Sequence, residues 1–328
     1  MLMNALDSSK RALGGWLWQE LTDAQIEFTL FCDPFAGSGR ASLFFKRRGY
    51  QVFACDILQS HYWRNRALIE NSSDFLTPEH YQALIAPTDA GAQALFQTWA
   101  DHYVTKEEVA WLGAWWQNIN TYPEFQENLN LKGLAYTAVY HTLNYWLNYN
   151  QSYLQPKPLP AQEVLKHYVQ QVNHFVCDNQ MPNMSYCMDA YQLVPDLPSD
   201  SLIWIYPPGM SGLRNTNRKT ELAECWTRRT PQINLEGVIE ADTYPKLGQP
   251  FHDPDTYLRA LSAFLDKCQH IRLWVVGHND AMGISMEQLE ELVSQKRTIW
   301  KKALFELPYP AAGDTYSDVE TVLVAVVE

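Results

Sequence analysis

Residues 27–57, EFTLFCDPFAGSGRASLFFKRRGYQVFACDI, constrain the fold of this chain more than any other stretch. An apolar segment ends at Asp33, a turn of small residues follows, an amphipathic segment carries Lys46, and a second apolar segment ends at Asp56. This order predicts a strand, a helix and a second strand. Parallel strands joined in this way need a crossover helix, and such crossovers are nearly always right-handed. We therefore expect an α/β fold with a doubly wound, mostly parallel sheet.

The remainder of the chain divides into a helical part and a strand-rich part. Residues 67–177 carry long helical patterns, such as KEEVAWLGAWWQNI and GLAYTAVYHTLNYWLNY. Strand-like segments return as SYCMDA, SLIWIYPPG, HIRLWVVGHND and the terminal TVLVAVVE. The pattern predicts an α/β domain of residues 1–66 and 178–328 that is interrupted by a helical insertion at 67–177. QPKPLP, at residues 155–160, is expected to form a linker or a sharp corner.

Composition excludes several classes of protein. Hydrophobic residues at 46% and charged residues at 19% are typical of a folded globular chain. A net charge of −12 means that any contact with nucleic acid must be local. The six cysteines form no CxxC pair and the nine histidines no metal-binding spacing, which favours reduced thiols and no metal site. With no signal-like N-terminus and no apolar run of membrane-spanning length, the sequence predicts a cytoplasmic protein.

The turn DPFAGSG indicates where a ligand is bound. Gly37 and Gly39 can adopt positive φ and let the backbone approach a ligand closely, while the following helix presents its first amides. Asp56, at the end of the next strand, is placed to accept hydrogen bonds from ribose hydroxyls. Glycine turns without a cofactor also occur, and Asp189 in CMDA is either a helix cap or a ligand contact. The glycine turn alone would also suit a dinucleotide-dependent oxidoreductase, but we rank this function below the two hypotheses given below, because the GxGxxG spacing of such enzymes is absent.

DPFAGSG, CDI, MDA and a strand that ends in a Pro-Pro turn resemble the adenine-specific DNA methyltransferases of the DNA adenine methylase type. The resemblance covers nearly the whole chain, including the first helix, SSKRALGGWLWQEL. It implies the fold of the S-adenosylmethionine-dependent methyltransferases, with a target-recognition insertion where residues 67–177 fall. It also implies that Asp56 binds the ribose and Asp189 the adenine of S-adenosylmethionine. The full cofactor set that it implies is Lys10, Asp33, Phe35, Ala36, Gly37, Gly39, Asp56, Ile57, Asp189 and Ala190.

The catalytic turn departs from the family's Asp-Pro-Pro-Tyr, because this chain has Tyr206, Pro207, Pro208 and Gly209 there. In the family pattern an acceptor carboxylate pulls on the N–H bonds of adenine's exocyclic amine and makes it a better nucleophile. A phenol with a reference pKa of about 10 is neutral and a weak acceptor. Gly209 has no ring to stack on a flipped base. Two hypotheses follow: a methyltransferase with an altered turn, or a non-catalytic relative that serves as a regulatory or protein-interaction subunit.

The distribution of charge predicts weak binding of duplex DNA. No arginine lies between Arg66 and Arg214, and this stretch has four lysines against 14 acidic residues. The segment 210–230 is locally basic, and we expect a loop there that is either solvated or in contact with phosphates through Arg214, Arg218 and Lys219. The insertion is rich in tryptophan, which indicates a core or a surface for a protein partner: Trp99, Trp111, Trp115, Trp116 and Trp146. His278, Asn279 and Asp280 follow a strand, where a capping or structural role is expected.

Overall fold

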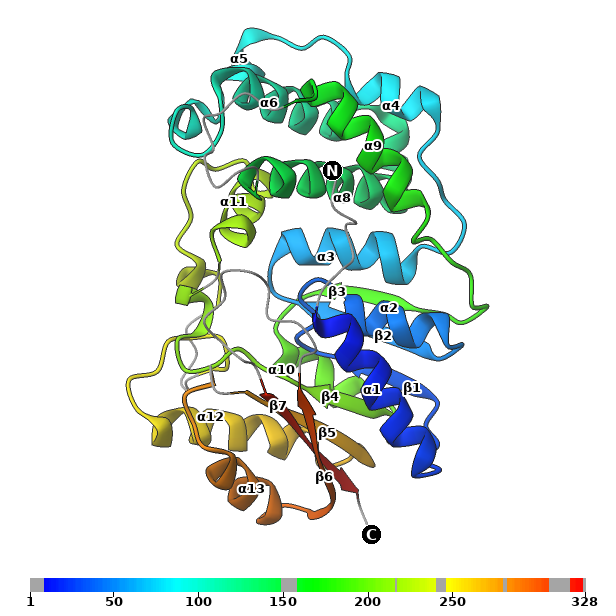
Figure 1. Cartoon of the computed structure of the whole chain (residues 1–328), viewed down its shortest axis with the longest axis vertical. Coiled ribbons are helices and arrows are strands. Elements are labelled where there is room, and N and C mark those ends of the chain that lie inside the picture. Colours follow the sequence, from blue (N-terminus) through cyan, green and yellow to red (C-terminus); the bar gives the residue numbers. More distant parts are fainter. Residues whose placement is uncertain are drawn as a thin grey trace. The chain divides into compact units, whose positions relative to one another are not determined.

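The computed structural model describes residues 9–148, 158–215, 217–239, 246–279, 282–306 and 319–326. The chain forms two compact units (Figure 1). An α/β unit contains the described residues within 6–57, 179–216 and 234–328, and a helical unit contains those within 58–178 and 217–233. The helical unit therefore begins earlier than the expected insertion, and it also takes in residues 217–233, which we had expected in the α/β domain.

The described strands of the α/β unit form one seven-stranded sheet in the order β3-β2-β1-β4-β5-β7-β6. Four parallel pairings join β3, β2, β1, β4 and β5 in that order. β7 runs antiparallel to β5, and β6 runs antiparallel to β7. The predicted doubly wound, mostly parallel sheet is thereby confirmed. The strands are β1 (Leu30–Asp33), β2 (Gln51–Asp56), β3 (Met184–Cys187), β4 (Leu202–Ile205), β5 (Leu273–His278), β6 (Thr298–Glu306) and β7 (Val319–Val326).

Helices cover both faces of this sheet (Figure 1). On one face, α2 (Arg40–Arg47) packs Phe45 against Phe31 of β1, with ring centroids 3.9 Å apart, and α1 (Ser9–Asp23) packs on α2. On the other face, the alternate residues of β1, β4 and β5 join a buried cluster with three helices: α10 (Ala190–Leu193), α12 (Pro254–Lys267) and α13 (Met286–Ser294). Successive side chains of a strand point to opposite faces of the sheet, so each strand contributes to the packed layer on both faces.

The strand ends lie where the sequence predicts them. β1 ends at Asp33 and β2 at Asp56, and the helix between them is α2. β6 was not predicted, because its sequence TIWKKALFE breaks alternation with two consecutive lysines. β6 is an edge strand that also carries a register irregularity between Ile299 and Lys301. β6 forms because it pairs with β7, and the local sequence pattern of β6 does not reveal that neighbour.

The helical unit contains the two long helices that the periodicity predicts, as α6 (Lys106–Thr121) and α8 (Leu129–Asn148). α8 lies very close to α3, since a Cβ added at Gly133 would be 2.9 Å from the Trp63 carbonyl oxygen. The other described α-helices of this unit are α3 (Gln59–Asn65) with a π-helical turn (Arg66–Glu70), α4 (Pro78–Leu84), α5 (Ala90–Ala94), α7 (Pro123–Glu127), α9 (Ala161–Asn173) and α11 (Arg218–Thr227). Of the expected corner QPKPLP, residues 155–157 lie outside the described residues.

A buried carboxylate joins α11 to α3 within this unit. Glu224 is fully buried and accepts hydrogen bonds from the backbone N–H groups of Gln59, at 3.0 Å, and Ser60, at 2.8 Å. Arg228, the C-cap residue of α11, lies 2.6 Å from the same carboxylate. The N-cap residue of α3, Leu58, has no capping side chain, so Glu224 satisfies donors that this helix end would otherwise leave open.

Most tryptophans of the insertion belong to its core. Trp99, Trp115 and Trp146 are at most 1% exposed, while Trp111 and Trp116 are partly buried. Of the two roles left open by the sequence, the core role is thus observed for three of them. In the described part of the chain, no helix combines the length and the apolar character that crossing a bilayer requires.

Candidate functional site

The glycine turn between β1 and α2 has the backbone conformation that its sequence predicts. Gly37 and Gly39 have φ values of 53° and 69°, in the left-handed region that side chains disfavour. The N–H of Gly37 donates to the Asp56 carboxylate over 2.9 Å, and the N–H of Ala36 donates to the Cys55 carbonyl over 2.9 Å. The turn is therefore held against the end of β2. α2 begins directly after Gly39 without a side-chain cap, so its first amides are directed at this turn.

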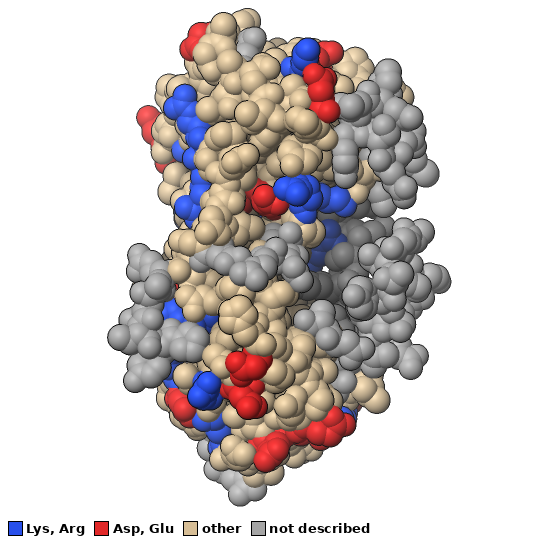
Figure 2. All heavy atoms as spheres, turned by 90° about the vertical axis from the view of Figure 1, so that its left-hand side faces the viewer, with Lys and Arg blue, Asp and Glu red and all other residues tan. Residues whose placement is uncertain are grey.

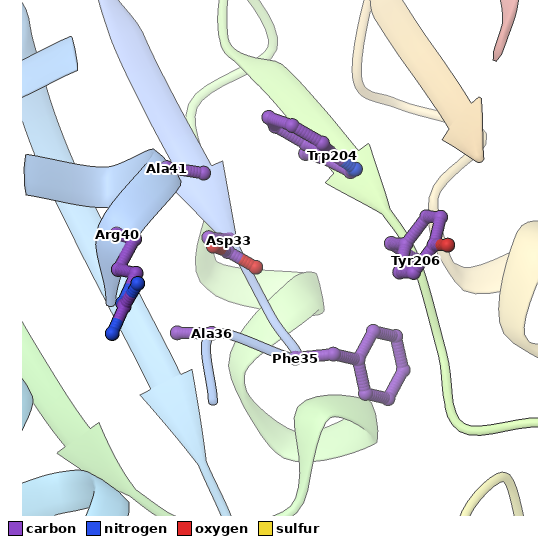
Figure 3. Close-up of a pocket in the computed structure, with 7 residues that line it drawn as sticks. All are labelled: Asp33, Phe35, Ala36, Arg40, Ala41, Trp204 and Tyr206. Carbon is purple, nitrogen blue, oxygen red and sulfur yellow. The ribbon is translucent and has the colours of Figure 1, made fainter. Parts of the chain in front are cut away.

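A small pocket, partly open to solvent, lies at the carboxyl ends of β1 and β4. β1 has β2 on one side and β4 on the other, so the strand order reverses at this position. Ligands of doubly wound folds bind in the crevice at such a reversal. Figure 3 shows the residues that line the pocket, which come from the glycine turn, the start of α2 and the end of β4: Asp33, Phe35, Ala36, Arg40, Ala41, Trp204 and Tyr206.

Asp33 and Phe35 are fixed by packing on opposite sides of the turn. Asp33 is 6% exposed, and Ser42 of α2 donates a hydrogen bond to its carboxylate over 3.1 Å. The ring of Phe35 packs against Phe264 of α12, with centroids 5.3 Å apart. The two side chains thus have defined positions at the pocket wall.

Tyr206, at the position of the family's catalytic carboxylate, is directed toward β5. Its ring lies against Gly277, where an added Cβ would be only 1.9 Å from Tyr206 Cδ2. Its hydroxyl accepts a hydrogen bond from the side-chain amide of Asn279. In Figure 3 this hydroxyl points away from Asp33. Tyr206 therefore presents its ring to the pocket while its hydroxyl is engaged elsewhere.

Sequence reasoning missed Gly277 and assigned Asn279 only a general structural role. A signal for Gly277 existed, since a glycine inside the apolar strand LWVVGH indicates close approach of another group. The partner, Tyr206, is 71 positions earlier and could not be identified from spacing. Asp280 lies outside the described residues, and the imidazole of His278 contacts the Ile284 carbonyl oxygen at 2.8 Å, in keeping with the expected structural role.

The Pro-Pro turn itself is anchored by residues of the same unit. The buried Tyr257 of α12 donates its hydroxyl hydrogen to the Pro208 carbonyl over 3.1 Å, and burial raises the pKa of this phenol. Beyond the turn, the N–H of Met210 donates to the Met282 carbonyl over 3.0 Å. The turn thus has a defined backbone, although Gly209 contributes no side chain to it.

Asp189 is occupied by contacts of the protein itself. One of its oxygens accepts the N–H of Tyr191 over 2.9 Å and caps α10, and the other lies 3.1 Å from the Lys246 ammonium. Of the two roles that the sequence suggests for Asp189, a helix cap or a ligand contact, the structure contains the helix cap. Ala190, the first residue of α10, is 6% exposed, and Ile57, after β2, is partly buried. Lys10 lies in α1, but its side chain is outside the described residues.

The basic residues after the Pro-Pro turn do not form one loop. Residues 218–227 form α11, so the expectation of a loop over 210–230 is wrong for them. Arg218 and Lys219 begin this helix in the helical unit, whereas Arg214 belongs to the α/β unit and its side chain is outside the described residues. Arg218 pairs with Glu221 at 2.9 Å. On the face drawn in Figure 2, Lys and Arg side chains are interspersed with acidic and uncharged residues. Among the described residues, no cluster of His, Cys, Asp and Glu could hold a metal ion.

The sheet order, the glycine turn and the crevice between β1 and β4 define an α/β fold of the methyltransferase type. Residues 9–108 match the model of the D12 class N6 adenine-specific DNA methyltransferases. The Type II methyltransferase M2.HphI of Haemophilus parahaemolyticus is 21% identical over 348 residues, an alignment that covers 98% of this chain and 96% of that protein. The chain is thus similar to adenine-specific DNA methyltransferases, as its motifs predict.

Proposed function

We propose that this chain binds S-adenosylmethionine in the crevice between the ends of β1 and β4. The observation that carries the proposal is the pocket at the strand-order reversal, which joins the glycine turn to the altered Pro-Pro turn. Gly37 leaves room for a ligand, because a Cβ added there would meet no protein atom closer than 4.0 Å. The residue types therefore fit the cofactor that the family generally uses. When bound, S-adenosylmethionine supplies an activated methyl group.

The resemblance assigns the parts of the cofactor to this chain's residues. The backbone of Phe35, Ala36, Gly37 and Gly39 approaches the cofactor, and Asp56 accepts from the ribose hydroxyls. This role fits the position of Asp56, since its carboxylate already accepts the Gly37 N–H at the edge of the turn. The remaining contacts that we propose come from Lys10, Asp33, Ile57, Asp189 and Ala190. For Asp189 to contact adenine, its carboxylate must share its hydrogen-bonding capacity with Lys246 and the α10 cap.

We further propose that methyl transfer to adenine is slow in this chain. The acceptor carboxylate is replaced by Tyr206, whose hydroxyl is bonded to Asn279, and the stacking ring is replaced by Gly209. Of the carbonyl groups of the turn, that of Pro208 already accepts the Tyr257 hydroxyl, which leaves the Pro207 carbonyl as the acceptor for an amine hydrogen. Loss of a positioned proton acceptor lowers a rate by about two to four powers of ten.

DNA is the methyl acceptor that the family implies, and we propose that this chain binds it weakly. Phosphate contacts come largely from Lys and Arg, and the stretch between Arg66 and Arg214 has few of them. Neutralising Arg214, Arg218 and Lys219 together should reduce both the affinity for duplex and its salt dependence. Tight, sequence-specific binding that persists at high salt would contradict this part of the proposal.

The alternative of a non-catalytic regulatory subunit is consistent with the same turn. A non-catalytic subunit would also bind S-adenosylmethionine, but it would transfer no methyl group to DNA. The aromatic residues of the insertion give it little support as a partner surface, because Trp99, Trp115 and Trp146 are buried.

Calorimetric titration with S-adenosylmethionine, followed by transfer of a labelled methyl group to duplex and single-stranded DNA, tests the proposal. We expect binding together with transfer that is slow on both substrates. Undetectable binding at millimolar cofactor would refute the assignment of the crevice. Rapid transfer that is lost on replacement of Tyr206 by Asp would instead show that Tyr206 is a working catalytic group.

A further inference from the structure

Trp204 of β4 carries a buried hydrogen-bond donor without an acceptor. Its side chain is 3% exposed, and no acceptor in the described part of the chain bonds to its indole Nε1. On the neighbouring strand, the fully buried Trp274 donates its indole N–H to the Cys268 carbonyl over 3.0 Å. Buried donors in folded proteins are nearly always satisfied, so an unsatisfied one requires an explanation. A ligand that the structure does not contain is such an explanation.

One other tryptophan shares this feature but has a different setting. The indole nitrogen of Trp115 in α6 also has no partner. Its ring is stacked between Trp111 and Trp146, with centroids 5.8 and 5.6 Å away, inside the core of the helical unit. Trp204, in contrast, lines the pocket at the ends of β1 and β4. The unsatisfied donor of Trp204 therefore belongs to a ring that lines a pocket, whereas that of Trp115 lies in a closed core.

The other polar groups of this pocket define the chemistry of that ligand. Asp33 contributes a carboxylate and Arg40 a guanidinium to the lining, and Figure 3 shows the indole nitrogen of Trp204 on the edge of the ring nearest Tyr206. One negative group, one positive group and one neutral N–H donor together complement a zwitterionic α-amino acid. A nucleobase carries no such pair of charges. The pocket is therefore suited to the amino-acid end of a methyl donor and not to the base that accepts the methyl group.

We infer that the indole N–H of Trp204 binds the carboxylate of the amino-acid end of S-adenosylmethionine. Arg40 and Asp33 supply the two opposite charges of the pocket lining that complement the zwitterion. The inference rests on the proposed function, since it requires that the methyl donor occupies this pocket. It adds a binding residue within the strand that precedes the catalytic turn, where the family motifs indicate none.

The substitution Trp204→Phe tests this role, because it removes the N–H and keeps an aromatic ring. Calorimetric titrations of both proteins would use S-adenosylmethionine, S-adenosylhomocysteine and 5′-methylthioadenosine, which lacks the amino-acid end. We expect the variant to bind the first two about tenfold more weakly, as for loss of a hydrogen bond to a charged group, and the third with unchanged affinity. Without ligand, the variant should lose less stability than Trp274→Phe, since both substitutions remove the same ring volume but only Trp274 gives up a hydrogen bond.

Trp274→Phe is the matched control on the adjacent strand. It breaks the bond to the Cys268 carbonyl, so it should lower the melting temperature and leave the ratio of affinities for S-adenosylmethionine and 5′-methylthioadenosine unchanged. Equal weakening of all three ligands by Trp204→Phe, or no weakening at all, would overturn the inference alone. Failure of the parent protein to bind S-adenosylmethionine would overturn the proposed function and the inference together.

Discussion

A single methyl group added at Gly277 should displace the ring of Tyr206, which precedes the two prolines of the Pro-Pro turn. A Cβ at this residue would lie 1.9 Å from Cδ2 and 2.5 Å from Cε2 of Tyr206. Both atoms belong to a rigid ring whose hydroxyl is bonded to Asn279. In Gly277→Ala the ring must therefore leave its position, and the bond to Asn279 must break or lengthen.

The size of the effect follows from three contributions. Overpacking of a well-packed site costs about 1 to 3 kcal/mol. Loss of the hydrogen bond between Asn279 and Tyr206 adds about 1 kcal/mol. Replacement of glycine by alanine returns up to about 1 kcal/mol, because it restricts the unfolded chain and Gly277 does not have positive φ. We expect Gly277→Ala to lower the free energy of unfolding by about 1 to 3 kcal/mol.

Urea denaturation of a double-mutant cycle measures this contact directly. The four proteins are the parent, Gly277→Ala, Tyr206→Ala and the double variant. In the Tyr206→Ala background there is no ring to displace, so Gly277→Ala should be neutral or stabilising. The coupling free energy should then be about 1 to 4 kcal/mol, of the size found for residues in contact.

Two results would refute this reasoning. If Gly277→Ala left the urea midpoint of the parent unchanged, the position of the Tyr206 ring would not depend on the absence of a side chain at Gly277. If the substitution destabilised both backgrounds equally, its cost would come from the strand itself and not from the tyrosine. Either result would remove the structural basis for the position of the Tyr206 hydroxyl.

Three further predictions concern the cofactor, the helical unit and the turn. Asp56→Ala should weaken S-adenosylmethionine binding by about 1 to 3 kcal/mol in calorimetry, and unchanged affinity would contradict the ribose contact. Glu224→Ala should destabilise the protein by about 3 kcal/mol in thermal or urea unfolding, because a buried carboxylate that holds two backbone donors and Arg228 is lost. Glu221→Ala, which removes a partly exposed carboxylate of the same helix, is its control and should change stability by less than about 0.5 kcal/mol. Replacing Tyr206 by Asp and Gly209 by Tyr together should raise methyl transfer to adenine in single-stranded DNA, since Pro207 and Pro208 keep the backbone of the turn fixed; no gain on any DNA would show that the turn is not the limiting defect.

Local sequence patterns were sufficient for the first half of the site. The turn DPFAGSG lies between two short apolar strands, and its conformation depends mainly on glycine and on the residues next to it. The ends of β1 and β2 at Asp33 and Asp56 could be predicted for the same reason. The long helices α6 and α8 followed from their periodicity, although the packing of α11 with them did not. That packing includes the hydrogen bond from the Trp226 indole to the Leu112 carbonyl and the contact between the Tyr140 and Thr227 hydroxyls, which join residues far apart in the chain.

The sequence by itself determined that this chain has a methyltransferase-type sheet, a glycine turn and a Pro-Pro turn without its usual side chains. Only the tertiary structure decided what the replacement residues do. The sheet order places β4 between β1 and β5, which brings Tyr206 against Gly277 and leaves Trp204 at the pocket beside Asp33. The pairing of Asp189 with Lys246 is likewise a contact between distant segments. Such contacts depend on which strands become neighbours, and that is decided by the packing of the whole sheet and its covering helices rather than by the residues on either side of a motif.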